Sequence, residues 1–581
     1  MSEVRRKQES ILLLDVGTCI TKTVLLDLVE GQYRLVATAQ APSTVGDPWQ
    51  NLSLGATDAI LRLEEICGRT LLGAEDRQLI TPEDQDGNGV DRLLVVSSAA
   101  EPLRVLLAGL VHDVSLASAR QAVDTTYARV QDVIALEQGE AGQRTASAQI
   151  DAILHSEADL ILLVGGTDGG AAEPMIEMAR EVVRVALYLM GEDAPAVLYA
   201  GNQVLAQELT DLFQEVTQVQ VTANVRPRVD IQDCAPAAQE LNAFYYEHKM
   251  RALPGLRTIR NWVHSLILPT VRATETAIRC CEQVFETGKP ALGVDLGSAS
   301  VVLHVADQEQ VQTTVRTDLG VGESLLGLLD QVEIDQILRW LPFELSETAF
   351  LDWFYHKAQH PQTLPQTRHE LLIEQAVARE LLRAACNADM TPACAPLIGS
   401  GSQLSRAPHP GQAALILLDG LQPLGVSTLY QDEGGLLPAV GSVARIEPLA
   451  AVQVLQNDGL LYLGTVVAPQ GTARPGARAL TVRSLDPEVE IDQPVRYGEL
   501  CLLSPLLRGS APEAPLLELI PARGFDLGRG PGKSIRVPFE PGALGLIIDA
   551  RGRPLALASD AEARRGQMDE WLYNMTGERG A

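Results

Sequence analysis

Residues 11–27 read Ile11-Leu12-Leu13-Leu14-Asp15-Val16-Gly17-Thr18-Cys19-Ile20-Thr21-Lys22-Thr23-Val24-Leu25-Leu26-Asp27. An apolar run ends at the carboxylate of Asp15, a glycine and a hydroxyl residue follow, and a β-branched run begins. This order predicts a strand, a tight turn and a second strand. Gly17 lets the backbone approach a phosphate closely, and the N–H groups of the turn with the Thr18 hydroxyl can hold its oxygens. An ordinary turn remains the alternative, because any hairpin can carry D-x-G-T. We predict that Thr21 and Lys22, at the start of the second strand, also belong to the residues that bind a cofactor.

The same pattern recurs in residues 293–305, Gly293-Val294-Asp295-Leu296-Gly297-Ser298-Ala299-Ser300-Val301-Val302-Leu303-His304-Val305. A third stretch, Leu397-Ile398-Gly399-Ser400-Gly401-Ser402-Gln403-Leu404-Ser405, predicts a short strand, a G-S-G turn and the start of a helix. Two such hairpins that clamp nucleotide phosphates, followed by a turn for the base and sugar, resemble the actin-like ATPases. The predicted fold class is therefore α/β, a two-lobed actin-like fold of the sugar kinase and heat-shock chaperone type.

The resemblance assigns roles to these residues. Asp15 and Asp295 would be catalytic and would hold Mg²⁺, directly or through water. Gly17, Thr18, Gly297 and Ser298 would cradle the phosphates, and the turn Gly399, Ser400 and Gly401 would approach the adenosine of ATP. The implied cofactors are ATP and Mg²⁺.

A further glycine-rich turn follows the apolar run Ala158 to Val164. A predicted helix, Glu173 to Met190, and a predicted strand, Ala196 to Tyr199, come next, which makes a βαβ unit with its turn at the carboxyl end of the strand. We include this turn in the cofactor-binding set, through Gly165, Gly166, Thr167, Asp168 and Gly169. Tight packing of strand against helix explains the glycines equally well. The preceding stretch, Leu103 to Leu136, is predicted to be mostly helical, with a strand near Ser115.

The chain has 581 residues, which is too long for one core. We expect a disordered leader at 1–10, a first actin-like lobe with the inserted βαβ subdomain at 11–290, and a second lobe at 291–450. From about residue 452, short apolar runs alternate with Gly, Pro and Asp turns, which predicts an added all-β domain at 451–581.

The composition of the chain limits the kinds of partner and of site that we expect. The net charge of −29 argues against binding to nucleic acid or to an anionic membrane. No apolar run approaches the ~20 residues that span a bilayer, and the first ten residues have no apolar core of a secretory signal, so we expect a cytoplasmic protein. The eight cysteines contain no C-x-x-C, which gives no support to a zinc site or a disulfide framework.

Two motifs are misleading. Asp84, Asp86, Asn88 and Gly89 match the opening of a calcium loop, but the position of its bidentate Glu is occupied by Val95. The stretch Gly528 to Ser534 resembles a P-loop, but the first glycine would have to be at Leu527 and no helix is predicted to follow. We predict a turn there.

Four stretches besides the first hairpin resemble the glutamate mutase L (MutL) family, which is unrelated to the mismatch-repair protein of that name. They are Ser97-Ser98-Ala99-Ala100, Val164-Gly165-Gly166-Thr167-Asp168-Gly169-Gly170, the Asp295 hairpin and Leu397-Ile398-Gly399-Ser400-Gly401. The resemblance covers roughly residues 11 to 450. It implies an ATP-binding accessory protein, of chaperone or reactivase type, with the subunits of an adenosylcobalamin-dependent mutase as partners. The chain has no D-x-H-x-x-G, the spacing of a base-off cobalamin site. The oligomeric state is left open.

One position departs from the expected pattern. Actin-like hairpins of this class usually continue D-x-G-G-x-T-x-D, and the second carboxylate is replaced here by Val302. A missing carboxylate weakens the positioning of Mg²⁺ and water, so hydrolysis would be slow or absent. The alternative function is therefore a pseudo-ATPase scaffold for protein assembly. A small-molecule kinase ranks last, because no separate residue set marks a substrate.

Overall fold

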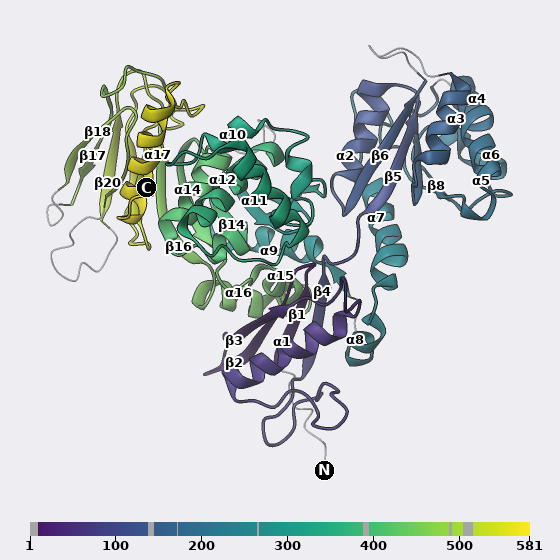
Figure 1. The fold of residues 1–581 in the computed structure, drawn as a ribbon, viewed down its shortest axis with the longest axis horizontal. Coiled ribbons are helices and arrows are strands. Elements are labelled where there is room, and N and C mark those ends of the chain that lie inside the picture. Colours follow the sequence, from purple (N-terminus) through teal and green to yellow (C-terminus); the bar gives the residue numbers. More distant parts are fainter. Residues whose placement is uncertain are drawn as a thin grey trace. The chain divides into compact units, whose positions relative to one another are not determined.

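The first hairpin lies inside a five-stranded sheet with the order β10-β4-β1-β2-β3 in the computed structural model (Figure 1). Its strands are β1 (Ile11–Val16), β2 (Ile20–Val29), β3 (Gln32–Pro42), β4 (Arg92–Ser97) and β10 (Leu268–Pro269). Strands β1, β2 and β3 are antiparallel neighbours, whereas β4 runs parallel to β1. Helix α1 (Leu52–Cys67) packs on β2 and β3; the Asn51 side chain caps its first turn and Gly68 ends it in the left-handed region, at φ 72°.

The second hairpin repeats this arrangement. The larger sheet has the order β13-β12-β11-β14-β15-β16-β22-β19. Its first five strands are β13 (Gln310–Arg316), β12 (Val301–Asp307), β11 (Ala291–Leu296), β14 (Leu397–Gly401) and β15 (Gly425–Gln431). As in the first sheet, the hairpin strands are antiparallel and the fourth strand runs parallel to the first. Two sheets with one strand order in one chain are the duplicated core of the actin-like fold, and the predicted fold class is confirmed.

The C-terminal segment adds β structure to this core. Strands β16 (Leu461–Ala468), β22 (Gly545–Asp549) and β19 (Leu500–Leu503) extend the larger sheet, so they are continuous with the second lobe. A separate four-stranded sheet has the order β18-β17-β20-β21 and contains β17 (Arg478–Ser484), β18 (Asp492–Arg496), β20 (Leu516–Pro521) and β21 (Ile535–Pro538). Helix α17 (Ala561–Thr576) ends the segment and packs against α14 (Pro410–Leu421) and β19; the sequence pattern did not predict this helix.

The structure describes residues 10–136, 145–170, 172–263, 267–308, 310–386, 394–486, 491–503 and 515–580. These residues divide into two units. Unit 1 contains residues up to Ser98, Arg257–Thr313 and Asp318 onward, and unit 2 contains Ala99–Leu256 and Thr314–Thr317. The predicted leader falls almost wholly on residues 1–9, outside the described part of the chain.

Unit 2 is built on five parallel strands with the order β6-β5-β7-β8-β9. These are β5 (Leu103–Gly109), β6 (Ala128–Ala135), β7 (Leu160–Val164), β8 (Ala196–Tyr199) and β9 (Val219–Val221). The prediction that residues 103–136 are mostly helical with a strand near Ser115 is wrong: β5 and β6 flank a short helical segment, His112–Val123, and Ser115 lies in that segment. Most residues of β5 are buried, and such a strand is apolar without a period-2 alternation, so it cannot be told from a buried helix by pattern alone.

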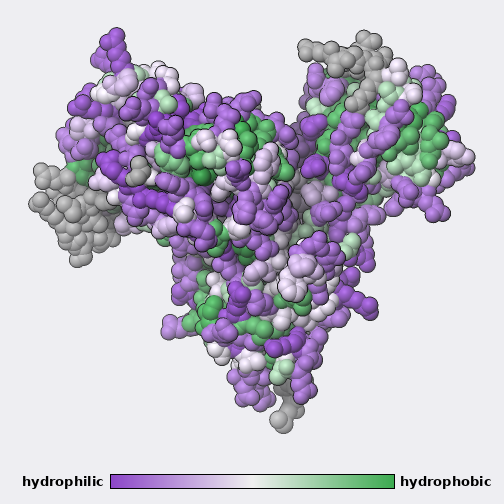
Figure 2. All heavy atoms as spheres, viewed as in Figure 1, coloured by the Kyte–Doolittle hydropathy of each residue, from purple (hydrophilic) through white to green (hydrophobic). Residues whose placement is uncertain are grey.

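The helices of unit 1 form its core with the sheets. They include α9 (Thr270–Phe285), α10 (Ile334–Leu338), α11 (Glu347–Gln359), α12 (Arg368–Ala385), α13 (Ser402–Ser405), α14 (Pro410–Leu421), α15 (Leu437–Ala444) and α16 (Pro448–Asn457). Helices α9 and α15 pack closely on each other and bury apolar side chains beside both hairpin sheets. The visible face of the molecule is mainly hydrophilic, with small apolar patches (Figure 2). The described residues include no helix long and apolar enough to cross a membrane.

Candidate functional site

Each hairpin places one aspartate next to the end of its first strand. Asp15 lies opposite Lys22 in the β1–β2 pair, and Asp295 lies opposite Val302 in the β11–β12 pair. The two hairpins are therefore equivalent in register but carry a lysine in one and a buried valine, 2% exposed, in the other.

The two aspartates share one electrostatic environment. Burial raises the pKa of Asp15 to about 6; Lys22 and a hydrogen bond from the Thr270 hydroxyl oppose the shift, whereas Asp295 and Asp432 add to it. Thr270 Oγ1 lies 3.1 Å from Asp15 Oδ1. Burial also raises the pKa of Asp295, again opposed by Lys22 and strengthened by Asp432. Lys22 thus acts on both aspartates, while the carboxylate of Asp432 raises the pKa of each, and the site holds an excess of negative charge.

The third carboxylate was missed by the sequence analysis. Asp432 follows directly after β15 and is 1% exposed. Its Oδ1 accepts from the N–H of Leu436 at 2.7 Å, and its Oδ2 accepts from the Leu437 N–H at 3.2 Å and from Ser400 Oγ at 3.3 Å. A polar residue at the carboxyl end of a strand parallel to β14 was the available signal, because ligands of α/β sheets gather at that edge.

Both turns are closed tightly at their glycines. In the first, Gly17 N–H donates to the Ile20 carbonyl at 3.0 Å, and a Cβ on Gly17 would lie 2.9 Å from that oxygen. In the second, Gly297 N–H donates to the Ser300 carbonyl at 2.9 Å, and a Cβ would lie 2.8 Å from it. Side chains are therefore excluded at both glycines, while Thr18 and Ser298 beside them stay partly exposed. The role of the two turns as phosphate cradles stays a prediction.

The two turns also contact each other. Cys19 Sγ lies 3.0 Å from Ser298 Oγ, and the same hydroxyl accepts from the Glu323 N–H at 3.2 Å. Two segments 279 residues apart in the chain are thus brought together at one end of a cavity.

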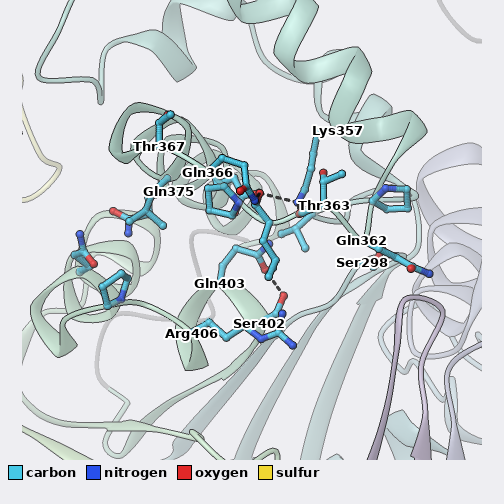
Figure 3. A pocket seen from close by; sticks show the side chains of 18 of the residues that line it. Ser298, Lys357, Gln362, Thr363, Gln366, Thr367, Gln375, Ser402, Gln403 and Arg406 are labelled. Carbon is cyan, nitrogen blue, oxygen red and sulfur yellow. Dashed lines mark hydrogen bonds and ion pairs between the residues drawn. The ribbon is translucent and has the colours of Figure 1, made fainter. Parts of the chain in front are cut away.

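This cavity has a volume of about 480 Å³ and is lined from Cys19, Ile20 and Ser298 at the hairpins to α12 and α13 (Figure 3). Lys357 and Glu374 form an ion pair on its wall, at 2.7 Å and with side chains only 7% and 11% exposed. The remaining lining includes Pro361, Gln362, Thr363, Gln366, Arg368, Gln375, Gln403, Arg406 and Gln412. Volume and lining suit a small organic ligand with a polar end at the hairpins.

The residues of the predicted adenosine turn are buried and do not themselves line this cavity. Ser400 is 5% exposed and bonds to Asp432, and Gly401 has φ 105° with its Cα so close to β11 that a Cβ would lie 2.4 Å from the Leu296 carbonyl. Gly399 packs against Leu404 and Leu417 in the same way. The side chains that line the cavity come from residues that follow the turn, namely Ser402, Gln403 and Arg406. Thr21 of the first hairpin is fully buried.

The glycine-rich turn after β7 lies in unit 2, whereas both hairpins lie in unit 1. Two buried asparagines fix it. Asn224 Nδ2 donates to the Gly166 carbonyl at 3.0 Å and to Asp168 Oδ1 at 2.9 Å, and Asn202 Oδ1 accepts from the Gly169 N–H at 3.1 Å. Gly165 has φ 152° and lies against Leu110 and Met175, so tight packing accounts for this glycine.

The oxygen donors beside the two hairpins decide whether Mg²⁺ fits this site. Among the residues that the structure describes, no three His, Cys, Asp or Glu side chains are grouped to hold a metal ion. Mg²⁺ is commonly bound through one or two carboxylates, waters and substrate phosphates rather than by an all-protein cage. Asp15 and Asp295, with the hydroxyls of Thr18 and Ser298, are hard oxygen donors of that kind and fit such an ion.

Comparisons with known proteins agree with the sequence resemblance. The model of the family described as MutL protein matches residues 11–459. The chain is 24% identical over 508 residues to "Protein MutL" of Clostridium tetanomorphum, a match that covers 77% of this chain and 99% of that protein.

Solved structures give weaker likenesses. Nucleotide-free acetone carboxylase is 10% identical, with 84% of this chain and 81% of that one covered and a TM-score of 0.35. Plasmodium falciparum glycerol kinase with ADP is 7% identical, with 77% and 92% covered and a TM-score of 0.28. At these scores the fold assignment rests on the two matching sheets and not on the likenesses. The family match over most of the chain is decisive: this chain belongs to the MutL protein family.

Proposed function

We propose that this chain is an ATP-binding conformational switch that serves an adenosylcobalamin-dependent mutase such as glutamate mutase. The observation that carries the proposal is the pair of equivalent hairpins, whose aspartates share the field of Lys22 while their turns meet at the end of one cavity. The family name, which the bacterial relative also bears, points to the mutase as the process served.

Different residues of the site would contact the phosphates, the Mg²⁺ ion and the adenosine of the nucleotide. Backbone N–H groups of the two glycine turns, with Thr18 and Ser298, would hold the phosphates, and Lys22 would neutralise part of their charge. Asp15 and Asp295 would hold Mg²⁺, directly or through water, and the bound ion would offset the remaining charge of the phosphates. The adenosine would occupy the cavity between α12 and α13, where Gln375, Gln403 and Arg406 supply polar groups.

Slow turnover fits the second hairpin. The position opposite Asp295 is a buried valine, so the second carboxylate that would orient water is missing. Val302 is also what favours the alternative, a pseudo-ATPase scaffold that binds nucleotide without hydrolysis and organises partner proteins. Closure of the two lobes on the nucleotide would change the surface offered to the mutase subunits in either case.

Several expectations remain proposals. They are the cytoplasmic location, the boundaries of the leader and of the four regions at 1–10, 11–290, 291–450 and 451–581, and a cofactor role for the turn from Gly165 to Gly169. The chain's net charge of −29 supports partners other than nucleic acid.

Calorimetric titration of the purified chain with ATP and ADP, each with Mg²⁺, tests the proposal. We expect both nucleotides to bind, and Asp15→Ala and Asp295→Ala to weaken binding. Asp352→Ala, at an exposed aspartate of α11, is the matched control and should bind as the original chain does. Absence of binding by both nucleotides would refute the proposal. ATP turnover, measured in parallel, distinguishes a hydrolysing switch from the pseudo-ATPase scaffold. Nucleotide binding without turnover would identify the scaffold.

A further inference from the structure

A second cavity in unit 1, of about 470 Å³, concentrates positive charge. It lies among α10, α12 and the segment that leads into α17, and its wall contains Arg339, Arg383 and Arg564. Among the described residues, its one carboxylate is Asp335. Because the whole chain has a net charge of −29, a cavity lined by three arginines is a local exception that calls for an explanation.

Two of the arginines share a single counterion. Arg339 Nη2 donates to Glu380 Oε1 at 2.7 Å, and Arg383 Nε lies 3.5 Å from the same oxygen. The indole N–H of Trp340 donates to that oxygen as well, at 2.6 Å. Glu380 has a side chain only 3% exposed, so one buried carboxylate balances two guanidinium groups.

The carboxylates of the neighbouring ion-pair network do not neutralise the arginines of the cavity wall, because they pair with other arginines. Asp419 pairs with Arg379 at 2.7 Å and with Arg551 at 2.8 Å, and Asp549 pairs with Arg551 and Arg553 at 2.7 Å each. Together, the described cavity wall and this network hold six arginines (Arg339, Arg379, Arg383, Arg551, Arg553 and Arg564) and four carboxylates (Asp335, Glu380, Asp419 and Asp549). Guanidinium groups outnumber carboxylates in this region, and those at the wall are partly exposed to the cavity, so an anion bound there would be attracted by the excess positive charge.

Donor groups at the wall remain available to such an anion. In the described part of the chain, the Arg564 guanidinium donates only to the carbonyls of Ala558 and Ser559, at 3.2 and 3.4 Å, and pairs with no carboxylate. The Nε–H of Arg339 also lacks a hydrogen-bond partner among the described residues, although this atom is buried and does not open onto the cavity. Guanidinium groups present parallel N–H donors that match the oxygens of a phosphate or a carboxylate.

We propose that this cavity binds a small oxyanion, a phosphate monoester or a dicarboxylate, through Arg339, Arg383 and Arg564. Its volume is within the range of metabolite sites. None of its lining residues belongs to the nucleotide cavity, so the proposal stands independently of the ATP site.

Titration of the full chain with inorganic phosphate and, separately, with succinate tests this site by calorimetry at low ionic strength. We expect one of the two to bind, and its identity distinguishes a phosphate-bearing from a dicarboxylate ligand. Arg564→Gln should weaken that binding about tenfold or more, because a charge-assisted pair is lost. Arg565→Gln is the matched control: it alters the next residue of α17, whose 4.0 Å ion pair is with the exposed Glu344 and which does not line the cavity.

Phosphate that entered the hairpin turns instead would bind equally to the chain and to Arg564→Gln, which would overturn the proposal, as would binding of neither anion. A second measurement needs no variant. Hydrogen exchange of the original chain with the bound anion should slow at residues 335–340 and 555–564; exchange that is unchanged in both segments would likewise reject the site.

Discussion

Lys22 lies opposite Asp15 in the first hairpin, and its charge lowers the pKa of both Asp15 and Asp295. One lysine thus acts on the aspartates of both hairpins, although the equivalent position of the second hairpin is a valine. The asymmetry leaves the second hairpin without a lysine at this position, and it makes Lys22 a residue through which the two aspartates share their electrostatics.

Replacing Lys22 by Met should therefore affect both aspartates. We expect the pKa of Asp15 to rise above its value of about 6, and the affinity for Mg-ATP to fall by about tenfold or more, because a charge-assisted contact to phosphate is lost. Calorimetry at constant pH measures the affinity. Lys533→Met makes the same chemical change in the loop before β21 and should leave the affinity unaltered; equal effects of the two variants would contradict the assignment.

The glycine turns make a steric prediction. Gly17→Ala and Gly297→Ala each place a Cβ less than 3.0 Å from a backbone carbonyl, at 2.9 and 2.8 Å, so the turn must open and its N–H groups must move. We expect nucleotide binding to be lost or strongly weakened in both. Gly46→Ala is the control, because nothing lies within 4 Å of its added Cβ and its φ is not positive. Retained ATP affinity in both turn variants would exclude the turns as phosphate cradles.

The main elements of the site could be predicted because they are local. A strand, a carboxylate and a glycine turn are contiguous in sequence, so both hairpins and the turn at Gly399 were identified from their order alone. Helix α1 is local in the same way, since the Asn51 side chain caps its first turn and Gly68 ends it.

What was missed depends on contacts between distant segments. Asp432 becomes part of the site only because β15 lies beside β14, and Lys357 reaches the cavity wall by pairing with Glu374 on another helix. Neither residue belongs to a contiguous motif. The prediction at residues 103–136 failed for a different reason, since a buried parallel strand has no polar alternation to mark it.

The raised pKa of Asp15 predicts a pH-dependent stability. Because the carboxyl has a pKa of about 6 in the folded chain and an ordinary value of 3.8, the folded form binds its proton more tightly. Stability should fall as the pH rises from about 4 to about 6 and then level off, with a cost of roughly 3 kcal/mol at neutral pH. Asp15→Asn removes that charge, so it should raise the Tm at pH 7.

The same variant should give a much smaller gain at pH 4, where Asp15 is protonated in the folded chain and only about half ionised in the unfolded chain. Thermal melts of the two proteins at both pH values make the comparison, and Asp352→Asn controls for loss of an exposed charge. A gain in Tm of the same size at pH 4 and pH 7 would show that the carboxylate is not the source.

The close contact of α9 with α15 leads to a prediction about the stability of the fold. Gly441 of α15 lies so close to α9 that a Cβ would come within 1.7 Å of the Ala273 carbonyl, which is backbone and cannot yield as a side chain would. Gly441→Ala should therefore separate α9 and α15 and lower the free energy of unfolding by about 2–3 kcal/mol. Gly566→Ala is the matched change in α17, where nothing lies within 4 Å, and it should stabilise by about 0.5–1 kcal/mol through helix propensity. Opposite shifts in Tm would tie the close approach of α9 and α15 to stability. If Gly441→Ala shifted Tm upward as Gly566→Ala does, the two helices would not be in contact at this glycine.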